Sequence, residues 1–188
     1  MSSNRNPNSK KMSDAKIAIS GKSGCGNSTV SRLLADSLGI RFINFTFRTL
    51  AQERGMDFEK VLALAKKDDS WDREVDGRQV ELAREEGGCV LGSRLAIWML
   101  PEADLKVYLT ASPATRAKRI HVREGGILKN IEMFTAERDR QDSERYLRIY
   151  NIDNNNYAFA DLVIDVNDIT PMQIAERIIA ELTRKLSS

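Results

Sequence analysis

The stretch best suited to chemistry is a glycine-rich segment near the amino terminus, Gly21-Lys22-Ser23-Gly24-Cys25-Gly26-Asn27-Ser28-Thr29. An apolar run, Ile17-Ala18-Ile19, precedes it, and an amphipathic stretch starts after it at Val30. Glycines let consecutive backbone N–H groups point toward one anion, and the N-terminus of a following helix adds positive partial charge. A strand, a glycine-rich turn and a helix in this order therefore predict that residues 21–29 bind the phosphates of a nucleotide.

The loop departs from the usual pattern G-x-x-x-x-G-K-S/T at its lysine position, which holds Asn27. Asparagine cannot neutralise phosphate charge. We therefore expect Lys22, which follows the first glycine, to reach round the loop and supply the missing ammonium as a catalytic group. Ser28 keeps the hydroxyl that such loops direct toward Mg²⁺, so it is the predicted metal contact. A strand-to-helix turn that binds nothing is the alternative interpretation of this segment.

Three charged residues in the carboxyl-terminal half have the spacing of one helix face, because Arg138, Asp142 and Arg145 are four and three positions apart. Arginine offers a planar fork that matches phosphate oxygens, and aspartate accepts hydrogen bonds from amino or hydroxyl groups. These three side chains are therefore candidates for binding a nucleotide. A solvent-exposed helix face with intrahelical ion pairs has the same spacing and stays open as an alternative.

Four further arginines are candidates for phosphate contacts. Arg119 and Arg123 are four positions apart, just before Gly125-Gly126. Like charges at this spacing repel unless an anion lies between them, so the pair favours a mobile lid, with a basic exposed helix as the alternative. Arg48 and Arg94 each follow a predicted strand. Ligands of parallel sheets bind at the carboxyl ends of the strands, which would place both arginines beside the loop.

The elements that must position these residues alternate between strands and helices. Strands are predicted at residues 17–19, 40–45, 89–91, 105–110 and 162–164, and helices near residues 30–38, 46–54, 57–65, 71–86, 113–124, 128–150 and 170–182. Such alternation is typical of a parallel sheet with helices on both faces, so we expect a three-layer α/β fold with a five-stranded parallel sheet.

Composition narrows the class of protein. The 188 residues suffice for one well-buried core, and residues 15–188 are expected to form a single domain behind a polar, disordered tail at residues 1–14. A net charge of +2 gives no overall field that would favour nucleic acid or a membrane surface, and no apolar run is long enough to span a bilayer. Cys25, Cys89 and the single histidine, His121, are too scattered for a metal cluster or a disulfide framework. We therefore expect a cytoplasmic monomer whose partners are small molecules.

From residue 16 to residue 182 the chain resembles the nucleoside monophosphate kinases, and within them the short cytidylate kinases of archaeal type. The resemblance is carried by the glycine-rich loop and by the segments FRTLAQERGM (47–56), DREVDGRQ (72–79), SRLAIWML (93–100) and SERYLRIYNID (143–153). The spacing of Arg138, Asp142 and Arg145 is also similar to the Arg-x-x-x-Asp-x-x-Arg segment with which cytidylate kinases hold CMP.

The resemblance implies a P-loop NTPase fold with helical NMP-binding segments at about residues 46–86 and a lid at about residues 116–150. It implies that ATP and Mg²⁺ are the cofactors and that the γ-phosphoryl group passes to CMP or dCMP. Arg119 and Arg123 would close over ATP, and Arg119 and Arg138 would act in catalysis. The implied acceptor-binding residues are Arg48, Arg94, Arg138, Asp142 and Arg145.

Two positions depart from the family pattern. Asn27 replaces the loop lysine, and Gly92 stands where the family usually has an acidic residue. Asp72 and Asp76 could substitute for that carboxylate, but we interpret them as acids on a helix surface. The alternative functions are a kinase of another small acceptor, such as AMP, dephospho-coenzyme A or shikimate, and a catalytically silent nucleotide-binding protein. The acceptor-side arginines argue against the silent protein, because a protein that binds only ATP has no use for them.

Overall fold

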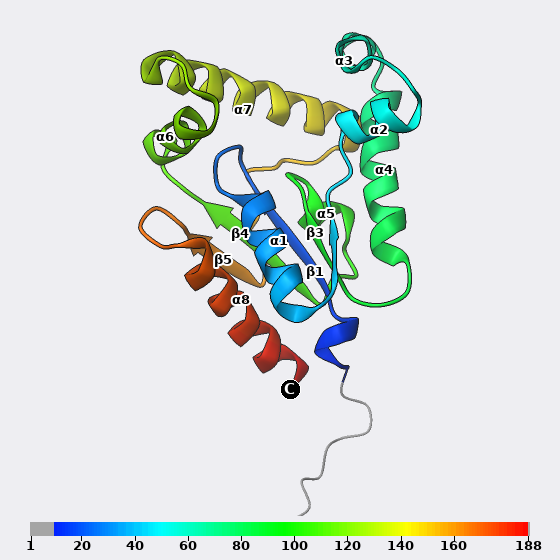
Figure 1. Ribbon diagram of the computed structural model, residues 1–188, viewed down its shortest axis with the longest axis vertical. Coiled ribbons are helices and arrows are strands. Elements are labelled where there is room, and N and C mark those ends of the chain that lie inside the picture. The colour runs from blue at the N-terminus through cyan, green and yellow to red at the C-terminus, as the bar shows by residue number, and fades with distance from the viewer. Residues whose placement is uncertain (1–9, 188) are drawn as a thin grey trace, which may run out of the picture.

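The computed structural model describes residues 10–187 and contains one parallel sheet, in the strand order β2-β3-β1-β4-β5 (Figure 1). The strands are β1 (Lys16–Gly21), β2 (Arg41–Ile43), β3 (Cys89–Gly92), β4 (Leu105–Thr110) and β5 (Leu162–Asp165). The predicted five-stranded parallel sheet is confirmed. β2 is shorter than the predicted strand at residues 40–45, because the chain leaves the sheet edge at Asn44 to enter the next helix.

Helices cover both faces of this sheet and extend beyond its carboxyl edge. They are α1 (Asn27–Leu38), α2 (Phe47–Glu53), α3 (Phe58–Ala65), α4 (Ser70–Arg84), α5 (Ala96–Met99), α6 (Pro113–Glu124), α7 (Leu128–Tyr150) and α8 (Pro171–Leu186). None of the helices among residues 10–187 is long and apolar enough to cross a membrane.

The core has two parts because neighbouring strand residues point to opposite faces of the sheet. Ile17 and Ile19 of β1 face α1 and α8, where they are fully buried with Leu34. Ala18, between them, faces the other side, where α4 and α5 pack with residues such as Ile97. The sheet therefore lies between two helical layers, which confirms the predicted α/β architecture.

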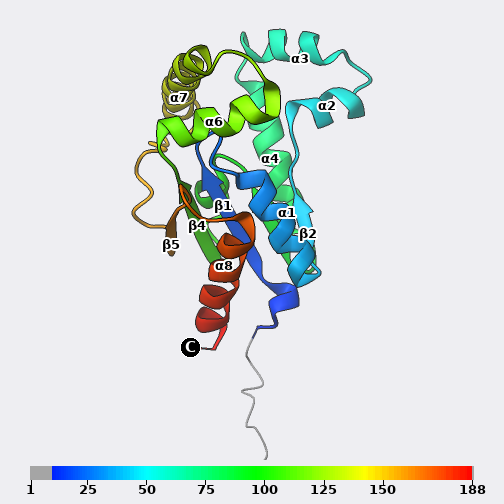
Figure 2. The ribbon, with the colours of Figure 1, turned by 60° about the vertical axis from the view of Figure 1, so that its left-hand side comes forward.

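The carboxyl edge of the sheet carries the helices that the sequence assigned to acceptor binding and to a lid. In Figure 1, α3 stands beyond the upper end of α4 and α2 lies beside that end, while α7 runs across from α6 to the α4 side. The end of α7 is fixed to α4, since Arg73 donates a 2.7 Å hydrogen bond to the carbonyl of Ile149. Figure 2 shows α6 and α7 above the loop that joins β1 to α1. Every strand end that holds a candidate residue thus opens beneath α7.

The start of the chain corrects one expectation. Residues 10–14 were assigned to a disordered tail, but Met12–Asp14 form a short 3₁₀ helix. The Gly88 N–H donates a 2.9 Å hydrogen bond to the carbonyl of Ser13, and Lys10 pairs with Asp104 at 2.6 Å. These contacts fasten the segment to the end of the sheet. The rest of the predicted tail, residues 1–9, lies outside the described residues.

Candidate active site

The glycine-rich loop joins β1 to α1 and has the conformation that its glycines predict. Gly24 and Gly26 have φ angles of 86° and 95°, which L side chains rarely adopt. A Cβ atom on Gly24 would lie 2.8 Å from the carbonyl oxygen of Arg116, so the loop could not approach α6 with a larger residue there. Gly26 directly precedes the first turn of α1. The positive end of that helix therefore faces the space enclosed by the loop.

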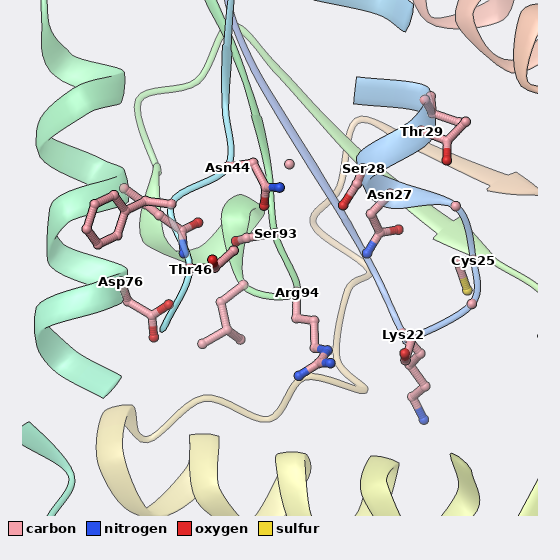
Figure 3. A pocket seen from close by; sticks show the side chains of 18 of the residues that line it. Lys22, Cys25, Asn27, Ser28, Thr29, Asn44, Thr46, Asp76, Ser93 and Arg94 are labelled. Carbon is pink, nitrogen blue, oxygen red and sulfur yellow. The ribbon is translucent and has the colours of Figure 1, made fainter. Parts of the chain in front are cut away.

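The side chains of Asn27 and Lys22 point to different places around the loop. The Asn27 side chain donates a 2.6 Å hydrogen bond to the carbonyl oxygen of Gly21, so it closes the loop across its base. Lys22 points away from Asn27 and Ser28 in Figure 3. Its ammonium group has no hydrogen-bond or ion-pair partner among residues 10–187. Ser28 is exposed to solvent. The loop therefore leaves one free cation and one free hydroxyl beside the phosphate-binding space.

A cleft of about 580 Å³ opens between the loop and α4. Its lining comes from the loop, the ends of β2 and β3, one face of α4, and the arginine side of α6 and α7. Figure 3 shows Lys22, Asn27 and Ser28 on one side, Asp76 on the other, and Thr46, Ser93 and Arg94 between them. The predicted nucleotide loop and the predicted acceptor residue Arg94 therefore share one cavity.

Asp142 is the centre of the acceptor-side charges. It is buried on α7, and its carboxylate contacts Arg94 at 2.9 Å and Arg145 at 2.9 Å. Arg145 also approaches Asp72 of α4 at 3.5 Å. Two guanidinium groups that share one carboxylate keep donors free for an anion, because each has five N–H groups. Arg94 and Arg145 both line the cleft, so this network fixes two guanidinium groups at its wall.

Asp72 and Asp76 correct the interpretation that they are acids on a helix surface. Asp72 is only 5% exposed, and both residues line the cleft. The Tyr150 hydroxyl donates a 2.7 Å hydrogen bond to one oxygen of Asp76. Burial raises the pKa of Asp76 to about 6, although the bond from Tyr150 opposes this rise. Burial also raises the pKa of Asp72, with Arg145 opposing it.

The lid arginines lie along the other side of the cleft. Arg119 and Arg123 both line it. Arg119 donates a 2.6 Å hydrogen bond to the carbonyl oxygen of Val166, just beyond β5. Arg123 is exposed and pairs with its neighbour Glu124. The two arginines therefore stand over the loop side of the cleft, where the sequence predicted contacts with ATP.

Three predicted acceptor residues are not part of the cleft lining: Asp142, which pairs with Arg94 and Arg145, and also Arg48 and Arg138. The Arg48 guanidinium stacks on the ring of Phe58, 4.0 Å from the ring centre, and this places it between α2 and α3. Arg138 is exposed on α7. Partial burial lowers the pKa of Arg138, and the positive charge of Arg94 lowers it further.

Arg116 is a buried residue that sequence reasoning did not single out. It is 5% exposed and makes two hydrogen bonds to Asp139 of α7, at 2.7 and 3.2 Å. A third, at 3.1 Å, reaches the carbonyl oxygen of Ser23 in the loop. Arg116 thus joins the loop, α6 and α7. Its spacing from Arg119 is that of any basic helix face, so the sequence offered no signal for its burial.

The structure explains why Gly92 has no carboxylate. A Cβ atom at this position would lie 2.4 Å from Ser31 Oγ and 2.8 Å from Ser31 Cβ. Ser31 is fully buried on α1, directly behind β3.

Among the described residues, no group of three His, Cys, Asp or Glu side chains is placed to hold a metal ion. The exposed Ser28 hydroxyl beside the phosphate space still fits Mg²⁺, since Mg²⁺ commonly keeps substrate phosphates and water as its other ligands.

Comparison with known proteins is consistent with this site. Residues 16–168 match the model of the "Cytidylate kinase-like family". The chain is 45% identical over 174 residues to "Cytidylate kinase 2" of Borreliella afzelii, covering 90% of this chain and 97% of the relative. It is 40% identical over 157 residues to "Cytidylate kinase" of Pyrococcus horikoshii, covering 82% of this chain and 81% of that protein.

A solved structure supports the fold. Shikimate kinase from Acinetobacter baumannii superposes with a TM-score of 0.63 at 18% identity, covering 91% of this chain and 94% of that one. The family model covers both the loop and the arginine segment of α7. The chain therefore belongs to the cytidylate kinase-like family.

Proposed function

We propose that this protein transfers the γ-phosphoryl group of ATP to CMP or dCMP. The observation that carries the proposal is the shared cleft, in which the phosphate-binding loop faces Arg94 and Arg145. Membership of the cytidylate kinase-like family and the names of the curated relatives point to the same reaction.

The two phosphate groups would be held by different parts of the chain. The N–H groups of residues 21–29 and the N-terminus of α1 would bind the ATP phosphates. Arg94 and Arg145, both braced by Asp142, would bind the acceptor phosphate. No general base is needed, because the attacking oxygen belongs to a phosphate that is already an anion. Positioning and charge neutralisation are then the main contributions of the protein.

Four side chains would stabilise the charge of the transferring phosphoryl group. Lys22 has a free ammonium at the rim of the loop and would turn toward the γ-phosphate. Ser28 would hold Mg²⁺, which supplies further positive charge to the phosphate oxygens. Arg119 and Arg123 line the same side of the cleft and would contact ATP from the lid. Removing one such preorganised donor typically costs about 3–4 kcal/mol in the transition state.

A coupled assay of ADP release tests the proposal. Purified protein is incubated with ATP and Mg²⁺ and with CMP, dCMP, UMP, AMP, shikimate or no acceptor. Turnover that requires a cytidine nucleotide is the expected result. Faster turnover with AMP or shikimate would mean that this compound, and not a cytidine nucleotide, is the acceptor. Measurable ATP binding with no turnover on any acceptor would instead mean that the loop without its lysine is catalytically silent.

A further inference from the structure

One face of α4 forms the wall of the cleft opposite the phosphate-binding loop. Asp72, Val75, Asp76 and Gln79 follow the i, i+3, i+4, i+7 spacing of one helix face, and all four line the cleft. In Figure 3, Asp76 lies across the cavity from Lys22 and Ser28, with Arg94 between them. An acceptor whose phosphate sits at Arg94, facing the loop, would therefore extend its nucleoside toward α4.

This wall carries polar atoms that lack partners within the described part of the chain. Gln79 is 7% exposed, and its side-chain amide has no hydrogen-bond partner among residues 10–187. The Oδ2 atom of Asp72 is buried and likewise has none there. Buried polar groups are nearly always hydrogen-bonded, because leaving one unpaired costs free energy. The wall therefore carries an unpaired carboxylate oxygen and an unpaired amide, and a polar ligand in the cleft can reach the Gln79 amide.

Asp76 is oriented by Tyr150. The Tyr150 hydroxyl donates to Oδ2 at 2.7 Å, which leaves Oδ1 as the available acceptor. Asp76 is also the α4 acid whose side chain Figure 3 shows at the edge of the cavity. An ionised carboxylate accepts hydrogen bonds and donates none, so it favours an amino group over a carbonyl group at that place.

We propose that Asp76 and Gln79 recognise the pyrimidine base of the acceptor and select cytosine over uracil. The Asp76 carboxylate accepts a hydrogen bond from the exocyclic amino group of cytosine. Uracil presents a carbonyl oxygen at the same position, and two acceptors repel there. The Gln79 amide offers both a donor and an acceptor to the neighbouring ring edge. This inference rests on the proposed function, because it assumes that the nucleotide phosphate binds at Arg94.

The variant Asp76→Asn tests the proposal with little change of shape. Its carbonyl oxygen still accepts from the Tyr150 hydroxyl, so its amide NH₂ replaces the carboxylate oxygen that faces the base. We expect kcat/KM to fall about 10- to 100-fold for CMP and to rise for UMP, as the loss of a hydrogen bond to a charged group implies. The ratio between CMP and dCMP stays unchanged. Glu81→Gln, on the exposed side of the same helix, is the matched control and leaves all three values unchanged.

The outcomes separate this inference from the proposed function. If the wild type phosphorylates CMP and Asp76→Asn keeps the same CMP-to-UMP ratio, base reading by α4 is wrong while the kinase activity stands. A variant that alters the CMP-to-dCMP ratio instead would assign the wall to the ribose and would also overturn the proposal. If the wild type phosphorylates neither nucleotide, the binding of CMP and UMP to the wild type and to Asp76→Asn is measured by calorimetry. A ratio of the two affinities that is the same in both proteins overturns base reading by α4. A second variant, Gln79→Leu, is expected to weaken binding of both bases.

Discussion

The Asn27 side chain is joined to Gly21 by a 2.6 Å hydrogen bond across the base of the phosphate-binding loop. The residue at the usual lysine position thus links the two ends of the loop and provides no charge to a phosphate. The nearest cation on the loop is Lys22, whose ammonium group is free among the described residues. Because Asn27 has a structural task, we expect Lys22 to supply the positive charge that the usual lysine provides.

Lys22→Ala should reduce kcat about 100- to 1000-fold, the loss typical for a preorganised donor to a transition state. The KM for CMP should change little, because the proposed binding residue for the acceptor phosphate is Arg94. Steady-state kinetics with ATP and CMP measure both values. Lys118→Ala, which removes an exposed lysine from α6, serves as the control. Unchanged turnover in Lys22→Ala would assign the missing charge to another residue.

Arg94→Ala should mainly weaken binding of the acceptor nucleotide. Arg94 contacts Asp142 at 2.9 Å and lines the cleft, so its removal takes away a charged donor for the acceptor phosphate. We expect the KM for CMP to rise about 10- to 100-fold, while the KM for ATP changes little. Arg84→Ala is the control, since Arg84 pairs with Glu102 on the surface. An effect confined to the KM for ATP would place the acceptor elsewhere.

The sequence was sufficient to predict the sheet, because its strands are apolar runs between clear turn and capping signals. β4 spans residues 105–110 as predicted, and the Ser112 hydroxyl caps α6 by accepting a hydrogen bond from the Thr115 N–H. The loop was also predictable, since its chemistry depends on local glycines. These features are encoded by neighbouring residues and need no knowledge of how distant parts pack.

The α4 face that lines the cleft was not predictable, because helical spacing shows which residues share a face but not where that face points. Asp72 and Asp76 have the spacing of a solvated surface, yet the packing of α7 against α4 encloses them. Arg48 illustrates the reverse case. It was expected to contact a phosphate, and its stacking on Phe58 depends on how α3 folds over α2. The catalytic and binding roles of all these residues stay predictions.

Gly92→Ala should destabilise the protein by about 1–3 kcal/mol, the usual cost of overpacking a core. The added methyl group would lie 2.4 Å from Ser31 Oγ, and the fully buried Ser31 has no room to retreat. Thermal unfolding of the single variants and of the double variant with Ser31→Gly measures the coupling. Ser31→Gly should restore part of the loss in the double variant. Additive effects of the two substitutions would show that the pair does not clash.

Asp139→Asn should lower stability and weaken ATP binding together. It leaves the buried Arg116 charge without its counterion, which typically costs about 3–5 kcal/mol. Because Arg116 also donates to Ser23, the same change loosens the phosphate-binding loop and should raise the KM for ATP. Chemical denaturation and kinetics measure the two effects. Glu144→Gln, which affects an exposed pair with Arg140, should change neither. A stable variant with a normal KM for ATP would contradict this role.

The choice between CMP and UMP should depend on pH through Asp76. Its pKa is raised to about 6 by burial, with Tyr150 and Arg145 of α7, Asp72 of α4 and Arg94 near β3 as the surrounding groups. Above this pKa the carboxylate accepts from cytosine, whereas below it the protonated acid can donate to the uracil carbonyl.

The ratio of kcat/KM for CMP to that for UMP should therefore fall about tenfold from about pH 8 to about pH 5. The reason is that a carboxyl group is about 90% protonated when the pH lies one unit below its pKa. Taking the ratio cancels the titration of the nucleotide phosphate, which both substrates share. In Asp76→Asn the ratio should be flat over the same range. A wild-type ratio that is equally flat would mean that the Asp76 carboxyl group does not face the base.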